Sequence, residues 1–408
     1  IINIHMKILH TADWHLGLRL NKIDLLDQMV LFLDWLADIV EKENIECILH
    51  AGDIFDTKHP PQDAVDLYNK WLAKMIKLNC QVIIIAGNHD SGRFISSPKI
   101  LFQNLDIRVI GHTSEKHEEE IILLHDKNGL QQAVICAIPF IRQGELAVFE
   151  AGMSSEQLAE NINKAMSDKY SASHAMAREM HPGLVTIGMG HLFIQGTEAS
   201  DVEHQIHVGN LGGLSLIKID HGFDYIALGH IHRPQGLSES GHIRYAGSPV
   251  ILSFSEMNDR KSVMILEIKD KNIQWEKLEV PMFRKFIRWT GSVEEIKDKI
   301  INHQKSFSLK DLIEVRVVED SNYGSAYAQF NEFLQELDSD ELIVAKKSFS
   351  TKDADVTEIA EENKYMVEDL QPKVIMQNIL GFNNYEEDVK ISLMEAFEKI
   401  ENDVHENQ

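Results

Sequence analysis

The chain has 408 residues, of which 44% are apolar and 25% are charged, as is usual for a globular protein of two or three domains. Its formal charge of −24 argues against a protein that coats DNA by itself, because such binding depends on an excess of Lys and Arg. Residues 331–408 hold 20 acidic residues against 7 Lys, so more than half of the negative charge lies in the last fifth of the chain.

The sequence predicts a cytoplasmic protein. No apolar run approaches the length of a membrane span, and the first ten residues lack the basic and apolar regions of a secretory signal. The cysteines, Cys47, Cys80 and Cys136, each lie inside an apolar run, which favours buried free thiols in a reducing compartment. Met6 is the expected natural start, with residues 1–5 an extension.

The first part of the chain alternates strand-like apolar runs with amphipathic helices. We predict strands at 6–12, 45–51 and 81–86, separated by helices at 24–43 and 61–78. Beyond them we predict a β-hairpin region at 106–140, a helix at 155–170 and strands at 183–189, 223–228, 243–245 and 263–268. This order predicts an α/β fold with β-sheets flanked by helices and a largely parallel core.

Near Pro281 the pattern changes. Strands are predicted at 286–290, 311–318 and 342–346, with helices at 293–303 and 327–337 between them. We therefore expect a main domain at 6–280, a smaller α/β capping domain at 281–349, and an acidic linker with C-terminal helices at 350–408. The helices within 371–402 either pack on the capping domain or bind a partner protein, and the sequence leaves both possibilities open.

Side chains that can bind metal follow five of the predicted strands. They are Asp13 and His15, then Asp53, then Asn88, then His191, and finally His230 and His232. In open α/β sheets, functional sites lie beyond the carboxyl ends of the strands, so these five segments are expected to converge. His230 and His232 are two positions apart, and within an extended strand they would face the same side.

The donor set of carboxylates, imidazoles and one amide oxygen suits Mn²⁺, Fe or Zn²⁺, and the absence of thiolates argues against a structural zinc site. Seven ligands with one shared carboxylate fit two ions about 3.5–4 Å apart, a pair that can clamp a phosphoryl group. A single histidine is more often structural. We expect His10 and His50, three residues before Asp13 and Asp53, to point away from the site.

The motifs DxH, GDxxD, GNHD, GH and GHxH, in this order, resemble those of the calcineurin-like metallophosphoesterases. The longer strings HTADWHLG, AGDIFDT, AGNHDS, YIALGHIHR and YAGSP are similar to the DNA nuclease subunits within that family, over roughly residues 6–280. The protein-phosphatase branch carries Arg-Gly directly after GDxxD. Thr57 and Lys58 stand there instead, which argues against a phosphoprotein phosphatase.

The resemblance implies roles for individual residues. One ion would be held by Asp13, His15, Asp53 and His232, and the other by Asp53, Asn88, His191 and His230, with Mn²⁺ the expected metal. His89 would protonate the leaving oxygen, Asp90 would orient His89, and Asp56 would support the ligands.

The resemblance also implies an activity and partners. Such proteins cleave DNA, as exonucleases on double-strand ends and as endonucleases on hairpins or single strands, in repair, recombination and replication. The chain has no Gly-Lys pair and hence no Walker A loop, so any ATP dependence would come from an ATPase partner subunit. A homodimer through the helices at 24–43 and 61–78, within a heterotetramer, is expected, although the same apolar residues also suit helices that only cover a sheet.

Two other functions stay open. The same core could hydrolyse small phosphoesters, which turnover of nucleotides without cleavage of a DNA hairpin would indicate. The second alternative is a non-catalytic scaffold whose site has decayed. A failure to bind metal ions would indicate this alternative.

Overall fold

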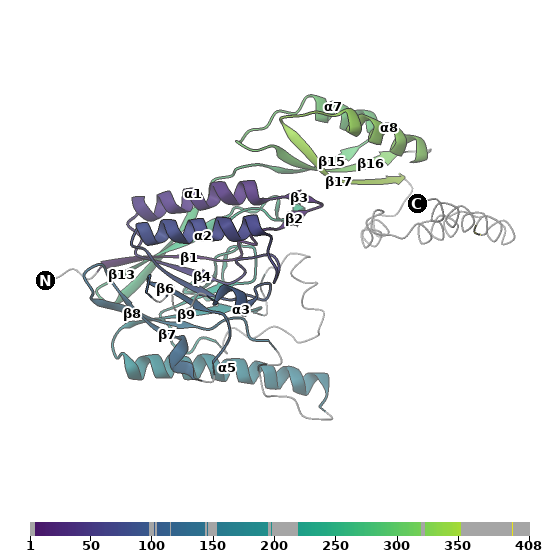
Figure 1. Ribbon diagram of the computed structural model, residues 1–408. Helices are drawn as coiled ribbons and strands as arrows, with labels where there is room; N and C mark the ends of the chain where they lie inside the picture. Colours follow the sequence, from purple (N-terminus) through teal and green to yellow (C-terminus); the bar gives the residue numbers. More distant parts are fainter. Residues whose placement is uncertain are drawn as a thin grey trace. The chain divides into compact units, whose positions relative to one another are not determined.

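The computed structural model describes residues 5–97, 102, 104–114, 116–142, 145, 153–194, 197, 219–319, 323–351 and 394 (Figure 1). The chain separates into two compact units. The first extends to Trp289 and includes Lys299–Val315 and Asp338–Lys347, whereas the second contains Thr290–Asp298, Arg316–Leu337 and the chain from Ser348. The domain bounds at 280 and 349 stay a prediction. Apart from Met394, the predicted helices at 371–402 lie outside the described residues.

The first of two six-stranded sheets has the order β14-β13-β1-β4-β5-β6. Its strands are β1 (His5–Thr11), β4 (Cys47–Ala51), β5 (Gln81–Ile85), β6 (Ile107–Ile110), β13 (Ser262–Lys269) and β14 (Asn272–Glu279). Strands β1, β4, β5 and β6 are parallel to one another, whereas β13 is antiparallel to both of its neighbours, β1 and β14. The register pairs Leu9 with Ile48 and Leu49 with Ile83, which brings the carboxyl ends of three strands to one edge.

The second sheet has the order β11-β12-β10-β9-β8-β7. Its strands are β7 (Ile121–His125), β8 (Gln131–Ala137), β9 (Val185–His191), β10 (Tyr225–Gly229), β11 (Gln235–Gly236) and β12 (Ile243–Tyr245). The four central strands are parallel, and β7 and β11 are antiparallel edges. Gly229 pairs with His191, so β9 and β10 also end side by side.

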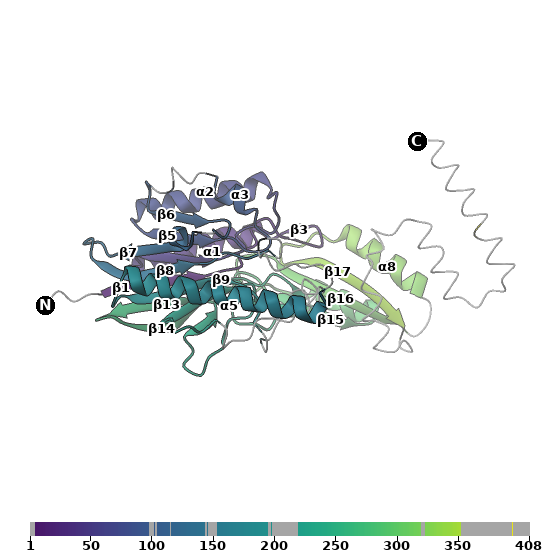
Figure 2. The same ribbon diagram turned by 90° about the horizontal axis from the view of Figure 1, so that it is seen from below.

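The two sheets pack face to face, and helices cover their outer faces. Buried side chains such as Ile83 and Ile187 meet between the sheets. α1 (Leu26–Lys42) and α2 (Gln62–Lys77) lie on one side of the paired sheets and α5 (Ser155–Met180) on the other (Figures 1 and 2). α5 begins with a capping box, in which Ser154 and Gln157 satisfy each other's backbone N–H groups.

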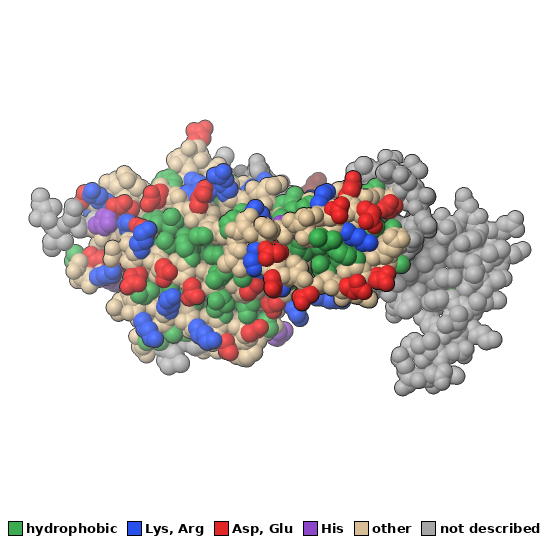
Figure 3. All heavy atoms as spheres, turned by 90° about the horizontal axis from the view of Figure 1, so that it is seen from above, with side chains coloured by type: hydrophobic (Ala, Val, Ile, Leu, Met, Phe, Trp, Pro, Cys, Tyr) green, Lys and Arg blue, Asp and Glu red, His purple; other side chains and the backbone are tan. Residues whose placement is uncertain are grey.

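Most apolar residues of α1 and α2 face the sheet. Phe32, Leu36, Trp71 and Met75 are all buried in the core that these helices form with the first sheet. Among the large apolar residues that are exposed in the described part of the chain, Val30 is the only one on α1 or α2. Figure 3 shows this side of the molecule, with acidic and basic side chains interspersed among apolar ones.

A third sheet has the order β15-β16-β17. Its strands are β15 (Phe286–Gly291), β16 (Asp311–Glu319) and β17 (Leu342–Thr351), and the intervening helices are α7 (Val293–Ile301) and α8 (Tyr323–Glu336). Within the second unit, Phe330 of α8 packs against Phe349 at a ring-centroid distance of 6.0 Å.

The predicted α/β fold with sheets flanked by helices is confirmed, and most predicted elements match observed ones closely. Three details differ. α1 begins at Leu26, because Arg19–Leu20 (β2) and Ile23–Asp24 (β3) form a small hairpin before it. α5 continues past residue 170 to Met180, and β14 is an unpredicted strand, because most of its residues are exposed and either polar or charged. None of the helices in the described ranges has the length and apolar character needed to span a membrane.

Candidate metal centre

The carboxyl ends of β1, β4, β5, β9 and β10 bring all seven predicted metal-binding side chains together. Asn88 Oδ1 lies 2.9 Å from both His191 Nε2 and His230 Nδ1. His191 Nε2 also lies 3.2 Å from Asp53 Oδ2. These four side chains form one continuous group around His191, the last residue of β9.

A second group shares Asp53 with the first. His15 Nε2 lies 3.7 Å from Asp53 Oδ2 and 3.2 Å from His232 Nε2. Asp13 contacts the first group, because both its carboxylate oxygens accept from the backbone N–H of His230, at 2.9 and 3.1 Å. Asp53 therefore lies between the imidazoles of the two groups.

Four of the seven residues adopt positive φ angles, which residues other than glycine rarely do. The angles are 54° for Asp13, 46° for His15, 54° for Asp53 and 101° for His230. Such backbone strain persists only where the surrounding structure enforces it, and it clusters at functional sites. It directs these side chains toward the cluster and away from the alternating directions of a strand.

The prediction that His230 and His232 face the same side of an extended strand is wrong. β10 ends at Gly229, and both histidines lie in the irregular segment after it. The alternation of side chains holds only within a strand. The two imidazoles turn to different partners, His230 to Asn88 and His232 to His15.

Gly52 and Gly87 allow the loops after β4 and β5 to approach the cluster. A Cβ atom on Gly87 would lie 2.1 Å from Asp53 Oδ1. One on Gly52, whose φ is +95°, would lie 2.2 Å from His191 Nδ1. Because both distances are well below van der Waals contact, any larger residue would displace a predicted ligand.

Contacts at Nδ1 orient two of the imidazoles. His191 Nδ1 lies 2.8 Å from the Ala51 carbonyl oxygen, which can only accept, so Nε2 is the atom left to face the cluster. His15 Nδ1 lies 3.2 Å from Asp56 Oδ1. Contacts of this kind fix the tautomer and ring direction of metal-binding histidines. Asp56 therefore touches the cluster through His15.

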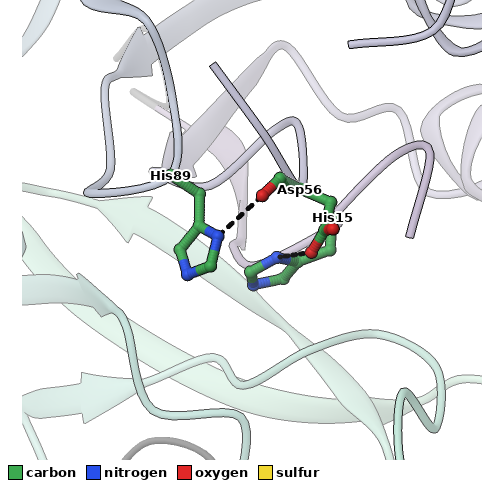
Figure 4. Close-up of side chains that lie close together, drawn as sticks. All are labelled: His15, Asp56 and His89. Carbon is green, nitrogen blue, oxygen red and sulfur yellow. Dashed lines mark hydrogen bonds and ion pairs between the residues drawn. The ribbon is translucent and has the colours of Figure 1, made fainter. Parts of the chain in front are cut away.

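His89 lies beside the cluster (Figure 4). Its Nδ1 donates to the backbone carbonyl oxygen of Asp56 at 2.7 Å, and its ring centroid is 4.8 Å from that of His15. The ligand atoms of His15, Asp56 and His89 lie within 4.8 Å of one another and could bind a metal ion. Because His89 Nδ1 is engaged by a carbonyl, its Nε2 is the atom that can meet a substrate.

The predicted role of Asp90 in orienting His89 is wrong. The Asp90 carboxylate accepts hydrogen bonds from the backbone N–H groups of Ile54, Phe55 and Gly87, at 3.3, 3.1 and 2.9 Å. A buried carboxylate is stabilised by several such donors, and Asp90 has no exposed surface. It therefore ties together the loops that follow β4 and β5.

The buried charges of the cluster favour a cation. Burial raises the pKa of Asp13 to about 7, although His191 and His232 reduce this effect. Burial opposes ionisation of Asp53 as well, but His191 and then His15 hold its pKa well below the usual range. Burial would lower the pKa of His191, and Asp53 raises it to about 9.

The donor set fits divalent metal ions. The described hydrogen bonds and ion pairs of Asp13 and Asp53 go to backbone N–H groups and imidazoles, and none goes to Lys or Arg. The ligand atoms of Asp13, Asp53 and His191 also lie within 4.8 Å of one another. Buried carboxylates without a basic partner and several imidazoles are characteristic of a metal site, so the centre binds divalent metal.

Glu256 and Lys261 contact the centre without any sequence signal. Glu256 Oε1 lies 3.0 Å from His232 Nδ1, and Glu256 Oε2 lies 2.7 Å from Lys261 Nζ. Burial would raise the pKa of Glu256, but Lys261 and His232 hold it well below its usual range. Both residues lie in a polar stretch that is typical of an exposed loop, so their burial could not be foreseen.

His10 and His50 are buried and contact residues outside the predicted ligand set, as expected. His10 Nδ1 lies 3.1 Å from the Tyr225 hydroxyl. The His50 ring packs edge-on against Trp14 at a centroid distance of 4.3 Å. The three cysteines are buried and free.

The family model for calcineurin-like phosphoesterases matches residues 6–234, more than half of the chain, and the chain belongs to this family. Within it, the chain is an SbcD-type member. The SbcD nuclease subunit of the Escherichia coli K12 SbcCD complex is 33% identical over 294 residues, which are 71% of this chain and 72% of that protein. The corresponding SbcD protein of Bacillus subtilis is 31% identical over 297 residues, 70% of this chain and 73% of that protein.

A solved dimetal phosphatase from Danio rerio is 11% identical and covers 68% of this chain and 99% of its own. Its TM-score of 0.38 is too low to define a shared fold by itself.

Proposed function

We propose that this chain is a two-metal DNA phosphodiesterase, the nuclease subunit of an SbcCD-type complex. The observation that carries the proposal is the convergence of seven metal-binding side chains from five strand ends, with His89 beside them. The relatives named as SbcCD nuclease subunits supply the substrate class. The expected activities are an exonuclease on double-strand ends and an endonuclease on hairpins or single strands.

Two ligand sets are proposed from the family resemblance. The contacts of His15 with Asp53 and His232, and of Asn88 with His191 and His230, support them, whereas Asp13 is assigned by the resemblance alone. Asp13, His15, Asp53 and His232 hold one ion, and Asp53, Asn88, His191 and His230 hold the other. The proposed metal is Mn²⁺, which mixed carboxylate and imidazole ligands suit. Asp53 is the shared ligand, supported by its position between the imidazoles of both sets.

The ions would make water more acidic and offset the charge that develops on the phosphoryl oxygens. The chain's own contribution to bond cleavage is assigned to His89. As water attacks the phosphorus and loses a proton to solvent, the bond to the 3′ oxygen breaks, and that oxygen takes a proton from Nε2 of the His89 imidazolium. The hydrogen bond from His89 Nδ1 to the Asp56 carbonyl oxygen supports this role, because it holds the ring with Nε2 directed away from the backbone and available to the substrate.

The proposed partners are DNA and an SbcC-type ATPase subunit, in a heterotetramer that contains two copies of this chain. The lack of a Gly-Lys pair supports an external source of any ATP dependence. A capping domain at 281–349 is part of the proposal, and residues 350–408 are proposed to bind the ATPase. A cytoplasmic location is proposed from the buried free cysteines.

The test is cleavage of a defined DNA hairpin with Mn²⁺, with and without the ATPase partner, beside turnover of a nucleotide monoester. The proposal expects hairpin cleavage. Turnover of the monoester alone would instead indicate a small-phosphoester hydrolase.

A further inference from the structure

Glu256 lies at the end of the short 3-10 helix η4 (Phe254–Glu256) and is 2% exposed. Both carboxylate oxygens are engaged. Oε1 lies 3.0 Å from His232 Nδ1, and Oε2 lies 2.7 Å from Lys261 Nζ and accepts from the Leu252 N–H at 3.2 Å. A buried carboxylate with this set of partners holds a single geometry, because any movement would leave charge unpaired.

Lys261 binds the backbone of His232. Its Nζ donates to the His232 carbonyl oxygen at 3.1 Å, to Ser248 Oγ at 2.8 Å and to Glu256 Oε2. Ser248 also donates its N–H to the His232 carbonyl at 3.1 Å. The main chain of His232 and its ring are thus fixed by one continuous buried network.

The network determines which nitrogen of His232 is presented. An ionised carboxylate can only accept, so Nδ1 carries the hydrogen, and Nε2 points toward His15 Nε2 at 3.2 Å. His191, in the other ligand set, is oriented by the neutral Ala51 carbonyl instead. His232 and His191 are therefore held by different kinds of partner, one charged and one neutral.

We propose that Glu256 and Lys261 are positioning residues that aim His232 and set the affinity of one cation site, the one shared with His15. This inference rests on the proposed two-metal function. Partners that orient metal-binding histidines typically contribute about 10–100-fold in metal affinity. Loss of the pair should therefore lower the affinity for one of the two ions and leave the affinity for the other unchanged.

The test measures Mn²⁺ binding to the metal-free full-length chain by calorimetry, with electron paramagnetic resonance to detect coupled ion pairs. Glu256→Leu with Lys261→Met removes the network without leaving an unpaired charge, a replacement that buried ion pairs often tolerate. We expect one dissociation constant to rise about 10–100-fold and the coupled signal to weaken, with the second dissociation constant unchanged.

The ion pair of Glu120 with Lys169 is a matched control. Glu120 is buried, its Oε2 lies 2.8 Å from Lys169 Nζ, and neither residue has a described contact with a predicted ligand. Glu120→Leu with Lys169→Met should leave both Mn²⁺ affinities unchanged. Glu256→Gln with Lys261→Met keeps an acceptor for His232 Nδ1 and should restore most of the lost affinity. An equal shift in the control, or no rescue by Gln, would overturn the inference.

Should the Leu and Met pair fail to fold, Glu256→Asp retains the charges and retracts the carboxylate, and it should weaken the same site several-fold. Unchanged affinities in Glu256→Leu with Lys261→Met, or in Glu256→Asp where that pair does not fold, beside a wild type that binds two ions, would overturn the positioning role alone. A wild type that binds fewer than two ions would overturn the proposed function and this inference together.

Discussion

At the scale of single residues, backbone atoms hold the proposed proton donor. His89 Nδ1 donates to the Asp56 carbonyl oxygen at 2.7 Å, and the His89 N–H donates to Asp53 Oδ1 at 2.9 Å. The ring is thus oriented without a carboxylate partner, unlike the histidine of a Ser-His-Asp triad. Asp90 influences it only through the loops that its carboxylate ties together.

The substitution His89→Ala separates chemistry from coordination. All seven proposed ligands remain, so the variant should still bind two ions per chain and bind DNA with little change. The cleavage rate should fall by about 10²–10⁴, the usual range for loss of a general acid. A nitrophenyl phosphodiester should be spared most of this loss, because its leaving group needs little protonation. Parallel metal analysis and kinetics on both substrates check this.

The exposed His112 is the control, and His112→Ala should leave both rates unchanged. If His89→Ala loses metal, or if both substrates slow equally, His89 is not the proton donor.

At the scale of elements, the strands that carry the site also bury ionisable side chains. His50 of β4 has no exposed surface and no hydrogen-bond partner at either ring nitrogen. Burial lowers its pKa from 6.5 to about 3, so the folded chain holds it neutral. The unfolded chain binds a proton near pH 6.5. The free energy of unfolding therefore has its full contribution from the neutral His50 ring above pH 6.5 and loses it as the pH falls toward 3.

Substitution of His50 by Leu should remove this loss. Between pH 7.5 and pH 5.0 the wild type should lose about 2 kcal/mol more of its free energy of unfolding than His50→Leu. Urea unfolding of the metal-free proteins at both pH values measures the difference. Identical pH dependence in the two chains would show that His50 does not contribute, and the exposed His112→Leu should behave as the wild type.

Much of the architecture could be predicted from hydrophobic periodicity, because the strands and helices of the main unit follow it closely. The ligand positions could also be predicted, since they follow apolar strands directly. The directions of His230 and His232 could not, because a φ of 101° at His230 depends on the surrounding loops. The role of Asp90 and the contact of Glu256 with the centre could not be predicted for a similar reason. The Asp90 carboxylate binds a backbone group 35 residues away, and Glu256 contacts His232, which is 24 residues away.

At the scale of the whole molecule, the acidic end of the chain is the proposed contact with the ATPase. Removal of residues 371–408 should leave two-ion binding intact and abolish association with the ATPase subunit. Co-purification of full-length and truncated chains with that subunit measures this, with metal content as the control for folding. Unchanged co-purification would refute the assignment.

The proposed homodimer through α1 and α2 faces a structural constraint. Their apolar residues largely cover the first sheet, and Val30 is the one exposed large apolar residue described on them. A dimer there must therefore depend on half-buried residues such as Trp35 and Leu67. We expect a dimer by light scattering at micromolar concentration, and dissociation on Trp35→Glu. A wild type that is monomeric under these conditions would contradict the prediction.

Two cations held through Asp53 are proposed to enable DNA cleavage, and the decisive experiment is cleavage of a defined DNA hairpin by Asp53→Asn in saturating Mn²⁺. The wild type and Asp168→Asn, at an exposed position of α5, are measured beside it. We expect no detectable cleavage by Asp53→Asn, because an amide cannot supply the charge that both ions share. Asp168→Asn should match the wild type. Cleavage by Asp53→Asn at a rate near that of the wild type would overturn the two-cation mechanism.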